Sequence, residues 1–182
     1  MAARLVVLSI CVLGLNSLPV LASDSVETGV SLRSSEVSAV VIGGPQLTVE
    51  PRVSPRVARR NQRKITASFR IALEKVREVP ECQEIFTKLG ADGVSALSGM
   101  RFYPIGSHEL KPNVCSGSVV HTLVGGGPIW VCQKFSRLSN AQAAMVILHE
   151  ALHHAGLTEQ PHDHRGMTSG AINDMVLKRC GL

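Results

Sequence analysis

The segment from Ser139 to His164 constrains this chain more than any other. It holds five of the seven histidines and an almost uninterrupted apolar run, AAMVILHEALHHAG. At 3.6 residues per turn, His149 and His153 lie one turn apart on the same face of a helix, so both rings can direct a nitrogen at one metal ion. Glu150 follows the first histidine directly, so its carboxylate can reach a metal-bound water rather than the metal itself.

A helix with so little polar surface is expected to be buried. Its histidines and glutamate then need partners, because a buried polar group without one is costly. A zinc ion supplies such a partner. The ends of the helix are also readable, since Ser139 or Asn140 can cap its first turn and Gly156 can end it in a left-handed conformation.

The full pattern is H-E-x-x-H-x-x-G-x-x-E, with Glu159 in its last position. This pattern resembles the zincin-type zinc metallopeptidases and is similar in layout to the metzincins. The resemblance implies that the chain turns back at Gly156 and that Glu159 is the third zinc ligand, beside His149 and His153. Metzincins usually carry His or Asp there, but a His₂Glu set is known in catalytic zinc sites. The likeness is confined to this stretch.

Together with the elements below, the resemblance implies an α+β fold: a small zincin-like domain with a buried active-site helix beside a short β-hairpin or sheet and a C-terminal helix. The implied function is that of an exported zinc metallopeptidase. It would bind Zn²⁺ and hydrolyse peptide bonds of a peptide or protein substrate through a metal-activated water. Glu150 would be the general base and acid.

Several alternatives stay open on the sequence alone. His162 or His164 can replace Glu159 as third ligand, orient a ligand, or belong to a solvated loop after Pro161. The motif can also mark a catalytically silent zinc-binding structural or interaction domain. A third interpretation is a protein that binds through its basic segment, with the histidine helix serving only as core.

The first 22 residues read as a signal peptide, with Arg4, an apolar stretch and the cleavage site Val20-Leu21-Ala22. We therefore expect a secreted or periplasmic protein without stable membrane insertion after cleavage. Residues 23–61 read as a disordered tail or pro-segment ending in a basic linker. Residues 52–64 hold six Lys and Arg and no acid, but no aromatic residue is interleaved, so we expect no nucleic-acid partner.

Regular structure is expected in residues 62–182. The elements expected from periodicity and turn residues are a helix over 62–79 stopped by Pro80, a short helix over 81–89, a turn capped by Asp92, a strand over 100–105 with Pro104 at an edge or an end, a hairpin with arms 119–124 and 129–135, and a last helix capped by Thr168 or Ser169.

Four cysteines remain after the leader, and an even number in an oxidising compartment favours two disulfides. The hairpin's turn centre places Cys132 opposite His121, out of register with Cys115. We therefore favour the pairs Cys82–Cys115 and Cys132–Cys180.

The cysteine count gives a first prediction. Free-thiol titration of the unfolded, non-reduced mature protein should find no reactive thiol, because all four cysteines should be oxidised. Four reactive thiols would contradict both the disulfides and the predicted export.

Overall fold

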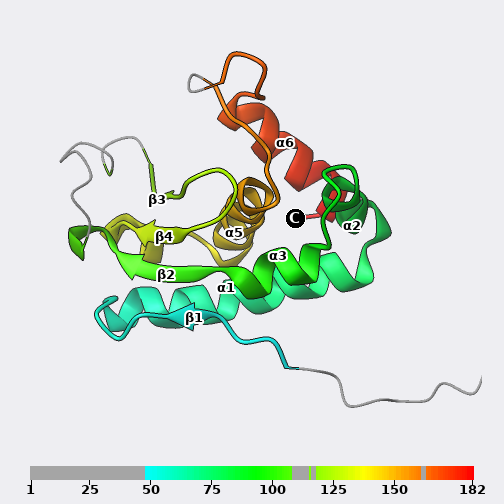
Figure 1. The fold of residues 1–182 in the computed structure, drawn as a ribbon. Helices are drawn as coiled ribbons and strands as arrows, with labels where there is room; N and C mark the ends of the chain where they lie inside the picture. The colour runs from blue at the N-terminus through cyan, green and yellow to red at the C-terminus, as the bar shows by residue number, and fades with distance from the viewer. Residues whose placement is uncertain (1–47, 108–114, 116–117, 161–162) are drawn as a thin grey trace, which may run out of the picture. The chain divides into compact units, whose positions relative to one another are not determined.

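The structure, a computed structural model, describes residues 48–107, 115, 118–160 and 163–182. The predicted leader, most of the predicted tail and His162 lie outside these residues. The described part contains five α-helices and a four-stranded mixed sheet, which agrees with the predicted α+β class (Figure 1). Among the described residues, no helix is both long and apolar enough to cross a membrane.

The sheet has the strand order β1-β2-β4-β3. Strands β1 (Arg52–Val53), β2 (Arg101–Pro104) and β4 (Pro128–Val131) run parallel, and β3 (Val120–His121) pairs antiparallel with β4. The predicted hairpin is therefore present, but its arms are shorter than expected. Pro104 stands at the end of β2, as predicted, although β2 itself is a central strand.

Alternation along the strands divides the sheet into two faces. Phe102, Ile129 and Val131 are buried in the same hydrophobic core as side chains of the helices. Arg101 and Tyr103 alternate with them and lie on the opposite face.

Two long helices form the centre of the core. Helix α1 (Arg59–Glu78) packs along α5 (Asn140–His154), and Phe69 and Leu148 are among their fully buried side chains. Helix α1 begins three residues before the predicted start at residue 62. Residues 52–64, expected to be a linker, thus contain β1 and the first turns of α1.

The shorter helices follow the predicted signals. Helix α2 (Pro80–Thr87) starts at its proline, and α3 (Gly93–Gly99) is capped by Asp92. The last helix, α6 (Ser169–Cys180), is capped by Thr168 and packs against α5 and α2. Short 3₁₀ segments, η1 (Ile105–Ser107) and η2 (Gln133–Arg137), follow β2 and β4.

All four described cysteines form disulfides, but the predicted pairing was wrong. The bonds are Cys82–Cys180 and Cys115–Cys132. Packing of α2 against α6 brings Cys82 to a Cα–Cα distance of 4.5 Å from Cys180. The hairpin register is also shifted by two residues from the expected one: His121 faces Trp130, not Cys132. The N–H of Cys132 donates to the carbonyl of Val119, the residue before β3.

The two disulfides should differ in their contribution to stability. Cys82–Cys180 spans 98 residues and Cys115–Cys132 spans 17. In the chain-entropy model a loop of ~100 residues contributes about 4.7 kcal/mol and one of ~15 about 3 kcal/mol. Replacing both Cys82 and Cys180 by Ala should therefore lower the free energy of unfolding by about 1–2 kcal/mol more than replacing Cys115 and Cys132.

Denaturant unfolding of the two double variants measures this difference. Peptide mapping of the non-reduced parent checks the pairing itself. Recovery of a Cys132–Cys180 peptide would contradict the pairing seen here.

Candidate metal centre

The start of α5 is fixed by a capping box. The Ser139 hydroxyl accepts a hydrogen bond from the Gln142 N–H at 3.1 Å, and the Gln142 side chain accepts from the Ser139 N–H at 3.0 Å. Two backbone donors that a helix start leaves unpaired are thus satisfied. This cap sets where the helix begins and which of its residues face the core.

The other end of α5 closes in a Schellman motif. Gly156 has φ of +99°, its N–H donates to the carbonyl of His153, and the Leu157 N–H donates to Leu152. Both bonds match that motif, in which a left-handed glycine reverses the chain. The turn also presents the Leu157 carbonyl to the Nδ1 of His153 at 2.7 Å.

The returning chain carries Glu159 back towards the helix. A β-bridge links Glu159 with Met167, and the Gln160 N–H donates to the Met167 carbonyl at 2.9 Å. A Cβ added at Gly166 would lie 2.7 Å from the backbone of Thr158 and Glu159, so glycine is required for this close approach. Met167 packs against the core.

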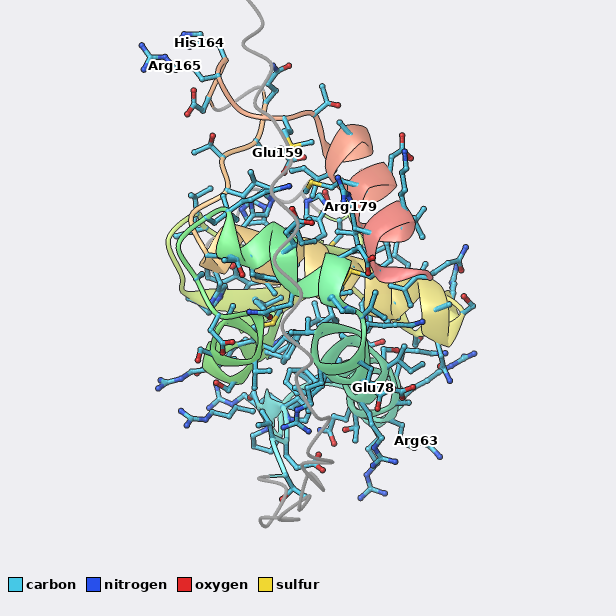
Figure 2. All side chains as sticks on the ribbon, turned by 90° about the vertical axis from the view of Figure 1, so that its right-hand side faces the viewer. Arg63, Glu78, Glu159, His164, Arg165 and Arg179 are labelled. Carbon is cyan, nitrogen blue, oxygen red and sulfur yellow. A yellow bond between two sulfur atoms is a disulfide. The ribbon has the colours of Figure 1, made fainter. Side chains whose placement is uncertain are left out.

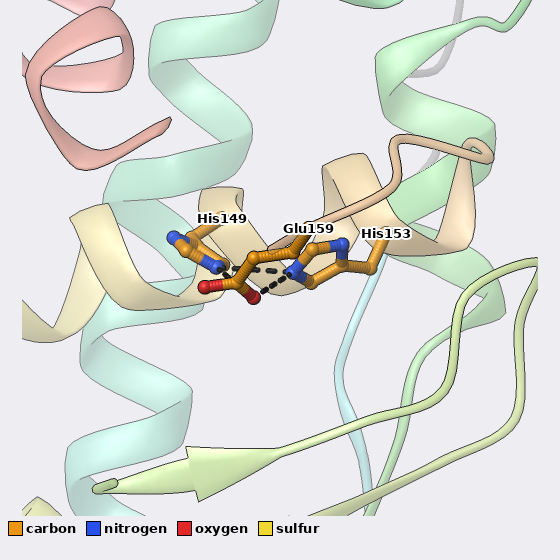
Figure 3. A group of neighbouring side chains, drawn as sticks. All are labelled: His149, His153 and Glu159. Atoms are coloured by element: carbon orange, nitrogen blue, oxygen red, sulfur yellow. Dashed lines mark hydrogen bonds and ion pairs between the residues drawn. The ribbon is translucent and has the colours of Figure 1, made fainter. Parts of the chain in front are cut away.

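Figure 3 shows the result: His149, His153 and Glu159 converge on one point. The Nε2 atoms of His149 and His153 are 3.1 Å apart. Glu159 Oε2 lies 3.0 Å from the Nε2 of His153 and 3.6 Å from that of His149. Both histidines are buried, and Glu159 is partly exposed. The structure thus brings together all three residues that the motif singles out.

The hydrogen bonds made by the two Nδ1 atoms determine whether the Nε2 atoms, which face Glu159, carry a proton or a lone pair. A carbonyl only accepts, so the Nδ1 of His153 donates to Leu157 O. The Nδ1 of His149 likewise donates to Asn173 Oδ1, at 2.8 Å, because an amide oxygen only accepts. In the neutral rings each Nε2 then carries a lone pair. Two lone pairs and a carboxylate oxygen face one another, an arrangement that needs a cation or a proton between them.

The spacing of the three atoms fits zinc. Two ligands of a tetrahedral zinc, each about 2.0–2.2 Å from the metal, lie about 3.3–3.5 Å apart. The three observed separations, 3.0, 3.1 and 3.6 Å, bracket this value. Burial lowers the pKa of His149, which favours the neutral ring that a metal requires.

Glu150 is buried beside this cluster without a hydrogen-bonding role. Its side chain is 7 % exposed, and no donor from the described residues reaches its carboxylate. Burial raises the pKa of Glu150 to about 8, and the negative charge of Glu159 contributes to the rise. The carboxyl group is therefore held neither by a hydrogen bond nor by an ion pair with a described residue, and it faces a cleft.

The cluster lies in the wall of an open cleft of about 610 Å³. Helix α5 contributes Glu150 and the two histidines, while β3 and the loop after it form the apolar side with Leu123 and Val124. The loop around Glu159 and the start of α6 complete the wall. Three potential ligands on one side of a solvent-filled cleft leave space for a water and a substrate.

The other histidines of the segment lie elsewhere. His164 is exposed at the far end of its loop, and Figure 2 shows it well away from Glu159. His162 is outside the described residues. His154 is half-buried and donates from Nε2 to the Gly127 carbonyl at 3.0 Å.

Sequence reasoning missed two groups that orient the rings. Asn173 is a polar residue between the buried Ile172 and Val176 of α6. A polar residue so close to buried positions could have suggested a ring-orienting role from the sequence. The Leu157 carbonyl carried no sequence signal, because any residue supplies a carbonyl. His121 was also missed; it lines the cleft and stacks on Trp130.

Comparisons with protein-family models, with curated proteins and with solved structures found no match for this chain. The resemblance to zincins stays a prediction from the motif, and the geometry above is independent of it.

Asn173 provides a test of the site's geometry. Groups that orient a ligating histidine commonly contribute about 10–100-fold to metal affinity. Asn173→Ala should therefore weaken zinc binding by about that factor, measured by competition with a chelator. Asp174→Ala, at the exposed next position of α6, is the matched control and should bind zinc like the parent. Equal affinity in both variants would show that Asn173 does not support the site.

Proposed function

We propose that this protein is an exported zinc-dependent metallopeptidase. The observation that carries the proposal is the meeting of three ligand atoms in the wall of an open cleft, directly beside a buried carboxyl group that has no described partner. A structural zinc site is normally closed by four protein ligands, whereas a catalytic site has three and an open position. The disulfides fit an exported protein.

In this proposal His149, His153 and Glu159 hold the zinc. When bound, zinc supplies Lewis acidity, which lowers the pKa of a coordinated water to about 7 and polarises a carbonyl group. Asn173 and the Leu157 carbonyl accept hydrogen bonds from the two Nδ1 atoms and so orient both Nε2 atoms towards the cluster.

Glu150 is the proton carrier. Its carboxylate takes a proton from the attacking water as the new C–O bond forms, and it then donates that proton to the amine nitrogen as the C–N bond breaks. Its place next to His149 suits this role, because the side chain faces the cleft without joining the three ligand atoms. Its burial leaves its carboxylate without a donor among the described residues.

The substrate is a peptide lying along β3. This strand is at one end of the sheet, and no described strand pairs with its outer edge. An extended peptide can add to such an edge through main-chain hydrogen bonds. Residues of β3 and of the loop after it line the cleft opposite α5, so the added peptide would pass close to Glu150.

The substitution Glu150→Gln separates catalysis from metal binding. Glutamine is nearly isosteric but cannot carry the proton, and general acid–base groups commonly contribute about 10²–10⁴-fold to the rate. Hydrolysis of a peptide library should fall by that factor, while zinc content and thermal stability stay near the parent's. Glu74→Gln, exposed on α1, is the matched control and should retain full activity.

Two further results decide between the possible outcomes. His149→Ala should lose zinc as well as activity, because it removes a ligand. If Glu150→Gln hydrolysed peptides as fast as the parent, Glu150 would not be the base. A parent that bound one zinc per chain and cleaved no peptide in the library would instead indicate a catalytically silent zinc-binding domain.

A further inference from the structure

The sheet face turned away from the core carries an unusual concentration of aromatic residues. The chain has one tyrosine and one tryptophan, and Tyr103 of β2 lies beside Trp130 of β4 in register. All four phenylalanines are buried in the core instead. Both amphipathic aromatic residues of the chain are therefore placed together on this face, where Trp130 is 3 % exposed and Tyr103 is half-buried.

These two residues line a second cavity of about 700 Å³. Other parts of its wall come from the start of β2, through Arg101, and from the glycine loop between β3 and β4, through Gly126 and Gly127. Leu123 lines both this cavity and the metal cleft, and its side chain is 54 % exposed. The loop that contains Leu123 therefore borders both the cleft beside the histidines and the second cavity.

The charge of this second cavity is positive. None of the described residues that line it is acidic, and Arg101 stands at its wall. The Arg101 guanidinium has no hydrogen bond or ion pair with any described residue. Its neighbour on β1 is Arg52, exposed and in register with it. Two like charges side by side cost energy unless an anion lies near them.

The glycine loop that lines the cavity contains backbone N–H groups without a described partner. Gly125, Gly126 and Gly127 have φ of +83°, +102° and +138°, values that other residues rarely adopt. The Gly125 N–H donates to the His153 carbonyl, whereas the N–H groups of Gly126 and Gly127 donate to no described residue. Successive backbone N–H groups in a turn can form an anion-binding concavity.

The loop is held firmly enough to form a wall. The Gly125 N–H bonds the His153 carbonyl at 2.9 Å, and the His154 ring bonds the Gly127 carbonyl at 3.0 Å. Both contacts attach the loop to the last turn of α5. The cavity therefore exists before a ligand enters, which reduces the entropic cost of binding.

We propose that this second cavity binds the carboxyl-terminal residue of a peptide. The aromatic and aliphatic wall of Tyr103, Trp130 and Leu123 takes an apolar side chain. Arg101 and the free N–H groups of Gly126 and Gly127 take the carboxylate. Binding here does not require zinc or hydrolysis, so the inference stands or falls separately from the proposed peptidase function.

The single tryptophan makes the proposal directly measurable. Trp130 is the chain's only indole and lines the cavity, so its fluorescence should change on binding. The probes are N-acetyl-L-phenylalanine, its uncharged amide and hexanoate, titrated against His149→Ala protein so that no zinc site can hold a carboxylate. We expect saturable binding of N-acetyl-L-phenylalanine and weaker binding of the other two.

Arg101→Gln should weaken binding of N-acetyl-L-phenylalanine by about three- to fivefold, since a charged hydrogen bond from an exposed side chain is lost. Binding of the amide should hardly change. Arg70→Gln, on the exposed side of α1 and in neither cavity, is the matched control and should bind like the unchanged chain.

Three results would overturn the inference. The first is no fluorescence change with N-acetyl-L-phenylalanine. The second is equal affinity for the acid and its amide, which would mean that the carboxylate is not recognised. The third is hexanoate binding as tightly as N-acetyl-L-phenylalanine, which would indicate a site for simple organic acids rather than for a peptide end.

Discussion

The geometry of the site depends on three electron-pair donors being held against one another. Two imidazole nitrogens and a carboxylate oxygen within 3.6 Å repel without a positive charge between them. The protein resists that repulsion through ordinary backbone chemistry: a capping box, a Schellman turn and a β-bridge. Folding has already brought the three ligand atoms together. The free energy of ordering them therefore does not reduce the affinity for a cation.

One carbonyl group ties the parts of this region to each other. The His153 carbonyl accepts from Gly156, which reverses the chain towards Glu159, and from Gly125, which anchors the loop between the two cavities. The ring of the same residue is one of the three converging groups. A displacement of this one residue would therefore reach the ligand cluster, the returning chain and the glycine loop together. The last turn of α5 thus connects the ligand cluster, the returning chain and the glycine loop.

A structural feature was predictable from the sequence when it depends on residues that are close together in the chain. Helix α5, its cap at Ser139 and its end at Gly156 depend on residues within one turn of each other, and all three were predictable. The pairing of Cys82 with Cys180 depends on how α2 meets α6, which no local pattern encodes. The hairpin register failed for a related reason: three successive glycines allow turns of several shapes, so counting from the turn centre misplaced Cys132.

The long disulfide has a consequence for resistance to proteolysis. Cys82 and Cys180 are 98 positions apart in the sequence, and the converging histidines and Glu159 all lie inside the loop that they close. A single backbone cut anywhere between the two cysteines leaves both fragments covalently joined. The chain can therefore be nicked without losing mass, and its two pieces remain at a high effective concentration for each other. Damage of this kind becomes visible only after reduction, when the fragments separate.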